Sequence, residues 1–170
     1  MDPKEWLSNF HPEFKDLSEE EISAILYFTL LGGLFEARAF NENGATAPAL
    51  QVRLLAWGDS GLLRVANFEG QLAYFKERYF RDGEPTRHYA GLNFRPRDNE
   101  GLVRRVLGGG DATDVEKVVA VFLVIWRFRN NLFHGAKWQY FLEGQLRNFQ
   151  EACLVLMRAL EIEREMVERQ

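Results

Sequence analysis

The sequence of 170 residues contains only one cysteine, Cys153, and three histidines. A single cysteine excludes an intramolecular disulfide and a zinc site built from several cysteines. The histidines at positions 11, 88 and 134 are scattered, and no cluster of carboxylates has metal-ligand spacing. We therefore expect no metal and no other cofactor, and a reducing compartment such as the cytoplasm.

Long apolar runs are also lacking. The longest, Val118–Trp126, has nine residues, whereas a helix that crosses a membrane needs about 20. The first ten residues, MDPKEWLSNF, lack a basic region followed by an apolar one, so no signal peptide is expected. These features predict a soluble, cytoplasmic protein that makes no contact with a membrane.

The chain has no excess of positive charge, since its net charge is −4. Such a balance argues against a non-specific nucleic-acid binder. The charges are nevertheless uneven. Residues 1–40 hold eight acidic and three basic residues, and residues 76–105 hold eight basic and five acidic residues. The middle of the chain is therefore the part suited to attract a polyanion.

Apolar residues recur every three or four positions through most of the chain, and no segment alternates as a β-strand does. Hydrophobic residues make up 46% of the sequence, which is enough for a folded core. The pattern predicts one domain over residues 1–170, an all-α antiparallel helical bundle with additional short helices. Long helices are predicted over 18–40, 60–82, 113–135 and 139–169, and shorter ones over 50–58 and 99–107.

Two of the long helices begin with the spacing of a capping box, in which a serine or threonine is followed three positions later by a glutamate. Ser18 and Glu21 stand at the first of these helices, and Thr113 and Glu116 at the other. Each pair predicts where its helix starts.

The helix over 113–135 carries polar residues where its apolar pattern asks for core residues. Arg129 continues the stripe of Phe122 and Ile125, and Asn130 continues the neighbouring stripe. A guanidinium against a core needs a carboxylate or another strong acceptor. Glu36 likewise interrupts an apolar stripe of the first long helix. We therefore expect Glu36 and Arg129 to meet across the bundle.

His134 follows Arg129 by five positions and directly precedes a glycine that ends the helix. An imidazole titrates near neutral pH, which suits general acid–base chemistry. Arg129 can hold a phosphate or stabilise charge that develops on phosphorus. Asn130 is placed to orient the imidazole or to contact a ribose hydroxyl. Together these residues suit attack of an RNA 2′-hydroxyl on its adjacent phosphate, without a metal.

The helical geometry sets a condition on this site. An offset of five residues turns by about 140° on an ideal helix. Arg129 and His134 therefore do not share a face of a regular helix. Either the helix distorts before Gly135 or a second subunit completes the site.

Arginine–histidine spacing alone is not distinctive in this chain. Six residues separate Arg127 from His134, and six separate Arg81 from His88. The second pair encloses a glycine and a proline, which exclude a continuous helix. Only the segment 129–135, RNNLFHG, combines a preceding apolar helix, asparagine after the arginine and glycine after the histidine.

The sequence RNNLFH resembles the R-x4–6-H signature of the HEPN (higher eukaryotes and prokaryotes nucleotide-binding) superfamily. Its members are small all-α bundles, and many are metal-independent endoribonucleases in toxin–antitoxin, anti-phage and RNA-processing systems. The resemblance implies that Arg129 and His134 are catalytic, that Asn130 assists, and that RNA is cut to leave a 2′,3′-cyclic phosphate. It also implies a homodimer with a composite active site, and a regulatory partner such as an antitoxin.

One position departs from the pattern of some such toxins. HEPN toxins that a nucleotidyltransferase antitoxin inactivates carry the modified tyrosine two residues after the histidine. That position is Ala136 here, and the nearest tyrosine is Tyr140. The departure argues against this form of control.

The basic residues Arg127, Lys137 and Arg147 flank the motif and are candidates for contacts with an RNA backbone. The alternative is that they are ordinary solvated helix charges. Aromatic residues after the motif either stack on bases, as in proteins that bind single-stranded RNA, or belong to the core or a dimer interface. These residues are Trp138, Tyr140 and Phe141.

Three functions are compatible with the sequence. The first is a HEPN-type endoribonuclease, with Arg129, Asn130 and His134 as its catalytic residues and Glu36 supporting them. The second is a HEPN-like module that binds RNA, a nucleotide or a partner protein without cutting. The third is a structural or interaction protein in which Arg129 and Glu36 only lock the core.

Overall fold

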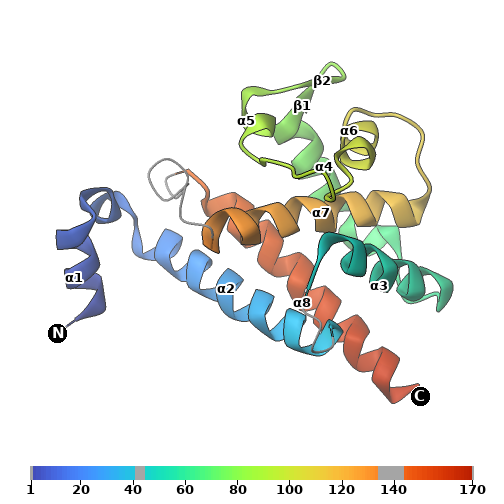
Figure 1. Cartoon of the computed structure of the whole chain (residues 1–170), viewed down its shortest axis with the longest axis horizontal. Helices are drawn as coiled ribbons and strands as arrows, with labels where there is room; N and C mark the ends of the chain where they lie inside the picture. The colour runs from blue at the N-terminus through green and yellow to red at the C-terminus, as the bar shows by residue number, and fades with distance from the viewer. Residues whose placement is uncertain (1, 41–44, 134–143, 170) are drawn as a thin grey trace.

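The computed structural model describes residues 2–40, 45–133 and 144–169, apart from the side chains at positions 12 and 13. Helices make up most of this described chain, and its strands form a single two-stranded sheet (Figure 1). The all-α prediction is confirmed. The elements are α1 (Pro3–Phe10), η1 (Pro12–Asp16), α2 (Glu19–Ala39), α3 (Ala47–Asp59), η2 (Val65–Phe68), α4 (Glu69–Tyr79), β1 (Phe80–Arg81), β2 (Glu84–Pro85), α5 (Arg87–Ala90), α6 (Glu100–Leu107), α7 (Asp114–Phe133) and α8 (Leu146–Glu168).

Both predicted capping boxes are present. Ser18 Oγ accepts a hydrogen bond from the Glu21 backbone at 3.2 Å, and the Glu21 carboxylate accepts one from the Ser18 backbone at 3.0 Å. The equivalent distances for Thr113 and Glu116 are 3.2 and 2.8 Å. These bonds satisfy backbone donors that a helix start otherwise leaves without partners. As a result, α2 and α7 begin where the sequence predicts.

The segment 60–82, predicted as one helix, is interrupted. Arg64 has an extended backbone, and the short 3-10 helix η2 precedes α4. After α4 ends at Tyr79, Asp82 and Gly83 form the turn between β1 and β2 with φ angles of 52° and 80°. Asp-Gly suits such a hairpin turn because both positions need positive φ. The sequence shows no β alternation at these positions because strands of two residues are too short to show it.

Helix α7 is the centre of the core. Every residue from 118 to 125 is buried, and α3, α4 and α6 pack around the helix. The ring of Phe122 contacts the rings of Phe35, Trp57 and Phe68, which come from α2, α3 and η2. A helix that is apolar on every side is stable only inside the protein. The surrounding elements are therefore arranged to cover α7.

The most extensive helix pair is formed by α2 and α8, which run in the same direction. Gln150 donates a hydrogen bond to the Glu20 carboxylate at 2.9 Å, and the Cys153 thiol lies 4.0 Å from the Ala24 carbonyl. Residue numbers thus increase together along the pair. Helix α7 runs in the opposite direction and crosses this pair (Figure 1). The antiparallel relation predicted for the bundle therefore applies to α7, and α2 and α8 are parallel.

Helix α8 begins later than its predicted start near Gln139. Residues 139–143 lie outside the described residues, and Gly144 has a φ of 67°, which a right-handed helix does not contain. The regular helix then runs from Leu146 to Glu168. Gly144 is therefore not part of α8, and the predicted helix is confirmed from Leu146 onward.

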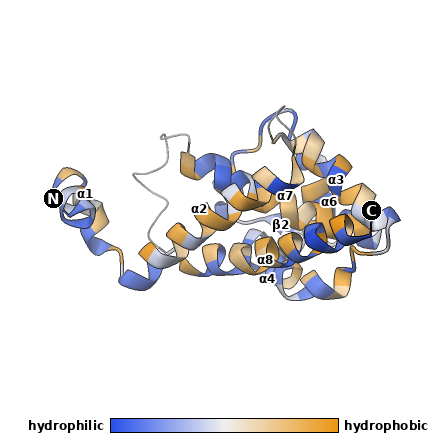
Figure 2. Cartoon of the chain, turned by 90° about the horizontal axis from the view of Figure 1, so that it is seen from below, coloured by the Kyte–Doolittle hydropathy of each residue, from blue (hydrophilic) through white to orange (hydrophobic). Residues whose placement is uncertain are grey.

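Helix α2 consists largely of apolar residues, coloured orange in Figure 2, and part of them are exposed. Its outward residues Leu26, Tyr27, Leu30 and Leu34 have exposed fractions between 48% and 59%. By length and composition α2 is apolar enough to cross a membrane, and only 22% of its most apolar window is buried. Core helices and signal sequences meet the same criterion, so this is weak support for a membrane contact. The cytoplasmic location stays a prediction.

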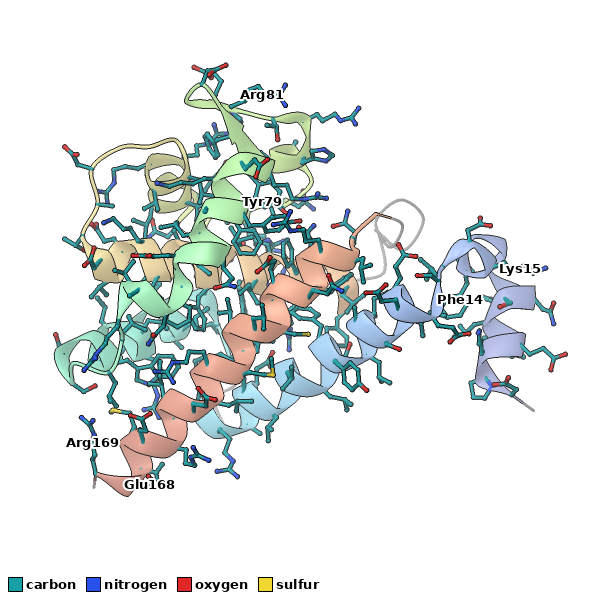
Figure 3. The ribbon with its side chains drawn as sticks, turned by 180° about the vertical axis from the view of Figure 1, so that it is seen from behind. Phe14, Lys15, Tyr79, Arg81, Glu168 and Arg169 are labelled. Atoms are coloured by element: carbon teal, nitrogen blue, oxygen red, sulfur yellow. The ribbon has the colours of Figure 1, made fainter. Side chains whose placement is uncertain are left out.

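Seen from behind, α4 lies between α7 and the viewer, beside the start of α8 (Figure 3). Tyr74 of α4 donates a hydrogen bond to Asn148 of α8 at 2.8 Å. Figure 3 also shows Tyr79 near the end of α4 and Arg81 in the hairpin that follows. The hairpin, α5 and the first turn of α8 therefore surround a common hollow, which is described below.

The glycines of the helices offer a test of this packing. A Cβ added at Gly33, on the exposed side of α2, meets no atom within 4 Å. We expect Gly33→Ala to raise the free energy of unfolding by about 1 kcal/mol, because glycine is disfavoured in a helix interior. A urea titration followed by circular dichroism measures the change.

Gly58→Ala is the matched control within α3. Its Cβ would lie 2.9 Å from Cγ2 of Val115, a branched side chain packed against the core. We expect this variant to lower the free energy of unfolding. Equal effects of the two substitutions would contradict the packing described.

Candidate functional site

Arg129 and Glu36 form an ion pair, as the sequence predicts. The Arg129 Nε and Nη2 atoms donate to the two Glu36 carboxylate oxygens at 2.7 and 2.8 Å. The side chains are 32% and 24% exposed, respectively. The pair thus joins the last turn of α2 to the C-terminal part of α7 at the protein surface. The predicted contact is confirmed, and the catalytic role of these residues stays a prediction.

Neighbours on α7 also fix the Arg129 side chain. Its guanidinium carbon lies 5.4 Å from the ring centroids of both Trp126 and Phe133, a distance at which cations are attracted to aromatic faces. The buried Asn130 accepts a hydrogen bond from Arg129 Nη1 at 3.1 Å through its side-chain oxygen. Glu36 and these three neighbours together determine the orientation of the guanidinium.

The space directly below the ion pair is small and apolar. A cavity of about 20 Å³ lies between α2 and α7 and is bordered by Gly32, Phe122 and Ile125, with Arg129 and Glu36 at its edge. Such a volume holds at most one water molecule. The cavity under Arg129 therefore cannot take a nucleotide, and a substrate must approach the guanidinium from the solvent side.

Several predicted site residues lie outside the described residues. They include the candidate catalytic His134 and the candidate RNA-binding Lys137. The aromatic candidates for base stacking lie in the same segment, 134–143. The described part of the motif ends at Phe133.

Arg127 is not a surface residue, and its predicted contact with an RNA backbone is wrong. Its side chain is 1% exposed, and Nη1 donates to the Asp98 carboxylate at 2.8 Å. Nε donates to the Leu92 carbonyl at 2.9 Å, and Nη2 donates to Asn131 at 3.3 Å. Burial lowers the pKa of the Arg127 guanidinium, and the Asp98 carboxylate opposes this effect. Arg127 therefore ties α7 to the segment between α5 and α6.

The sequence did not predict the contacts that Asn131 and Asp98 make with Arg127 beside the candidate site. Asn131 Nδ2 donates to the carbonyls of Gly91 and Leu92 at 3.2 and 3.1 Å. The signal for Asn131 was its position one helical turn after Arg127. Asp98 gave no such signal, because it lies in an irregular segment.

Arg147, the third candidate for RNA binding, is exposed at the start of α8. Its guanidinium carbon lies 4.4 Å from the ring centroid of Tyr74, and its Nε lies 3.5 Å from the Glu151 carboxylate. Its side chain is 66% exposed. This position is compatible with an RNA contact, which stays a prediction.

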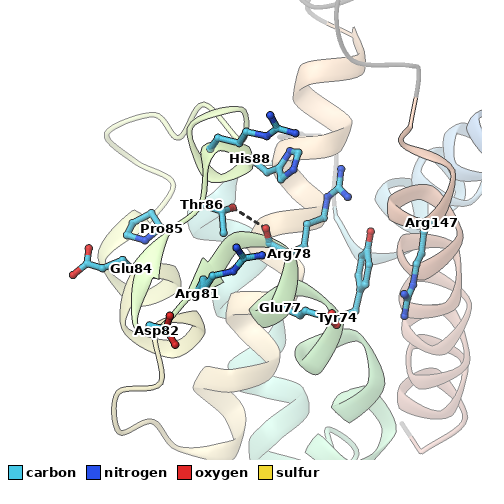
Figure 4. A pocket seen from close by; sticks show the side chains of 11 residues that line it. Tyr74, Glu77, Arg78, Arg81, Asp82, Glu84, Pro85, Thr86, His88 and Arg147 are labelled. Atoms are coloured by element: carbon cyan, nitrogen blue, oxygen red, sulfur yellow. Dashed lines mark hydrogen bonds between the residues drawn. The ribbon is translucent and has the colours of Figure 1, made fainter.

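Arg147 borders a cavity of about 910 Å³, shown in Figure 4. The other basic residues around it come from α4, the hairpin and α5. The sequence singled out none of them as site residues, and its signal was only the basic excess of residues 76–105. They are Arg78, Arg81, Arg87 and His88.

Within the described residues, no group of three or more histidine, cysteine, aspartate or glutamate side chains is arranged to hold a metal ion. No protein-family model, no curated protein and no solved structure matches the chain.

We expect substitutions of the two arginines of α7 to change the free energy of unfolding by different amounts. We expect Arg127→Ala to lower the free energy of unfolding by about 3–5 kcal/mol, because it leaves the buried Asp98 carboxylate without its partner. Arg129→Ala should cost only about 1 kcal/mol, since its ion pair is partly solvated. Chemical denaturation of both variants measures the difference. A larger loss for Arg129→Ala would mean that its pair with Glu36 chiefly locks the core.

Proposed function

We propose that the chain is a metal-independent endoribonuclease that cuts RNA by attack of a 2′-hydroxyl on the adjacent phosphate. The observation that carries the proposal is an oriented, solvent-accessible arginine, Arg129, within the sequence RNNLFH. Its resemblance to the HEPN signature supplies the chemistry. The described geometry supplies a guanidinium whose donors are in part still available.

The hydrogen bonds of Arg129 determine what it can bind. A guanidinium has five N–H donors. Described residues use three of them: Glu36 accepts from Nε and Nη2, and Asn130 accepts from Nη1. One N–H therefore remains on each terminal nitrogen. Two donors in this arrangement fit two oxygens of one phosphate group.

The reaction needs a base, an acid and stabilisation of negative charge. In the proposed mechanism His134 performs one of the two proton transfers and water the other: the 2′-hydroxyl loses its proton, and the departing 5′-oxygen gains one. The 2′-oxygen bonds to phosphorus as the bond to the 5′-oxygen breaks. The products are a 2′,3′-cyclic phosphate and a 5′-hydroxyl. Arg129 stabilises the charge that develops on the phosphate oxygens.

A homodimer with a composite site is part of the proposal. Arg129 and His134 do not share a face of a regular helix, and the cavity beside Arg129 is too small for a nucleotide. A second copy supplies the missing surface. The exposed apolar side chains of Leu26, Tyr27, Leu30 and Leu34 on α2 are suited to such an interface.

A second candidate function is a module that binds RNA, a nucleotide or a partner protein without cutting. The observation that favours it is the bidentate ion pair between Glu36 and Arg129. A carboxylate at this distance cancels much of the positive charge of the arginine. In this alternative the Arg129 guanidinium keeps too little net positive charge to stabilise the transition state of cleavage.

The deciding test is cleavage of mixed cellular RNA in excess EDTA. We expect wild type to cut, and His134→Ala to cut about 10²–10⁴ times more slowly, because it lacks the acid–base group. Arg129→Ala should lose about 10²–10³-fold, as expected when a charge-stabilising donor is removed. The new ends should be cyclic phosphates, detected by mass spectrometry.

The control substrate is RNA carrying 2′-O-methyl groups, which lacks the attacking hydroxyl and should stay intact. Circular dichroism establishes that each variant is folded. If folded wild type binds RNA without cutting it, the second candidate function replaces the first.

A further inference from the structure

The cavity of about 910 Å³ is cationic although the chain as a whole is anionic. Four arginines and one histidine line it, against three carboxylates, while the net charge of the protein is −4. These residues come from α4, the hairpin, α5 and α8, so the fold gathers them from separate elements. The four arginines exceed the three carboxylates by one, so the lining has a net positive charge, which attracts anions from solution. The expected ligand is therefore an anion.

Three of the arginines are not neutralised by an ion pair with a described carboxylate. Within the described part of the chain, no carboxylate forms an ion pair with Arg78, Arg81 or Arg87. Figure 4 shows the carboxylates of Asp82 and Glu84 at the hairpin, on the far side of the cavity from Arg147. Figure 4 also shows Glu77 near Tyr74, and within the described residues Glu77 forms no ion pair with the three arginines, which stay accessible to a ligand.

Arg78 has one unpaired hydrogen-bond donor. Its Nε atom is buried and has no hydrogen-bond partner among the described residues. Buried donors in native proteins are nearly always paired, because an unpaired donor loses its hydrogen bonds to water without replacement. A bound oxyanion that contacts this guanidinium stabilises it, either directly at Nε or through the adjacent amino groups.

His88 reports the electrostatic field in the cavity. Its pKa is lowered by burial first, and then by the positive charges of Arg78 and Arg87. Burial is the larger cause, and the two arginines add to it because a nearby positive charge disfavours the protonated imidazole. An anion bound there would raise the pKa of His88 again.

The arrangement favours a chain of phosphates over one phosphate or a stacked base. Arg81, Arg78 and Arg147 follow one another across the cavity in Figure 4 and belong to three different elements. The ring of Tyr74 is covered by the Arg147 guanidinium at 4.4 Å and is not free to stack on a base. A ligand recognised through spaced cations, without an aromatic platform, is read by its backbone.

We propose that this cavity binds the phosphodiester backbone of a single RNA strand, independently of base sequence. The inference rests on the proposed function, for which the cavity holds the substrate. It assigns phosphate-binding roles to Arg81, Arg87 and Arg147, with Arg78 as a partly buried fourth cation. Each contact releases counter-ions, so binding weakens as salt concentration rises.

The test measures binding apart from cleavage. Fluorescence anisotropy follows a labelled single-stranded RNA in which every 2′-hydroxyl is methylated, so that it cannot be cut by internal attack. The variant Arg81→Gln/Arg87→Gln/Arg147→Gln removes three exposed cations and should keep the fold. We expect affinity to fall about tenfold or more, and the slope of log K against log salt to flatten by about two.

Arg164→Gln is the matched control. Arg164 is also exposed on α8, with 71% of its side chain accessible, but it does not line the cavity. It should bind RNA like wild type. If the triple variant and the control bind equally well at every salt concentration, the proposal is overturned.

Two further measurements separate this ligand from other phosphates. Adenosine monophosphate and inorganic phosphate should bind far more weakly than the strand, since each offers one phosphate to several cations. A mononucleotide that binds as tightly as the strand and depends on the same arginines overturns the strand proposal. The pKa of His88, followed by NMR, should rise when the methylated RNA is bound, and an unchanged pKa contradicts the proposed location.

The two proposals fail in different ways. If wild type binds the methylated strand through the cavity but does not cut unmodified RNA, the ribonuclease proposal fails and the binding site stands. If His134→Ala abolishes cleavage while the triple variant binds and cuts like wild type, the catalytic proposal stands and the cavity proposal fails.

Discussion

The burial of α7 on every side is the constraint on which the rest of the structure depends. An ordinary surface helix directs its polar residues to water, whereas α7 has eight successive buried residues before its polar end. Polar side chains there need partners within the protein, because an unpaired buried charge costs several kcal/mol. Asp98 supplies the partner of Arg127, and Glu36 that of Arg129. The segment before α6 and the end of α2 are therefore held at the end of α7.

The two arginines at this end of α7 differ in burial because they are two positions apart on the helix. Residues two positions apart on a helix are turned by about 200°. Arg127 therefore points toward Leu92 and Asp98, where it is enclosed, while Arg129 points toward α2 at the surface. The same residue type thus gives an internal tie on one face and an accessible guanidinium on the other. Only the second can meet a substrate.

The sequence predicts the contacts that join regular elements and misses those that involve irregular ones. Glu36 and Arg129 each interrupt an apolar stripe on a long helix, so their meeting follows from two periodic patterns. Asp98 lies in a segment where apolar residues do not recur at regular intervals, so no spacing in the sequence links it to Arg127. The two-residue strands of the hairpin are equally invisible to periodicity. The cationic cavity was missed for a related reason, since four separate elements contribute to it.

The charge distribution then links the cavity to the motif. The net charge of the chain is −4, whereas the arginines that line the cavity outnumber its carboxylates, so the proposed RNA contact lies where positive charge gathers. Arg129 faces α2, whereas the cavity lies between the hairpin, α5 and the start of α8, with α7 behind it (Figure 4). The sequence RNNLFH begins in the last turns of α7. The two proposals together therefore require one strand to contact both the cavity and this end of α7.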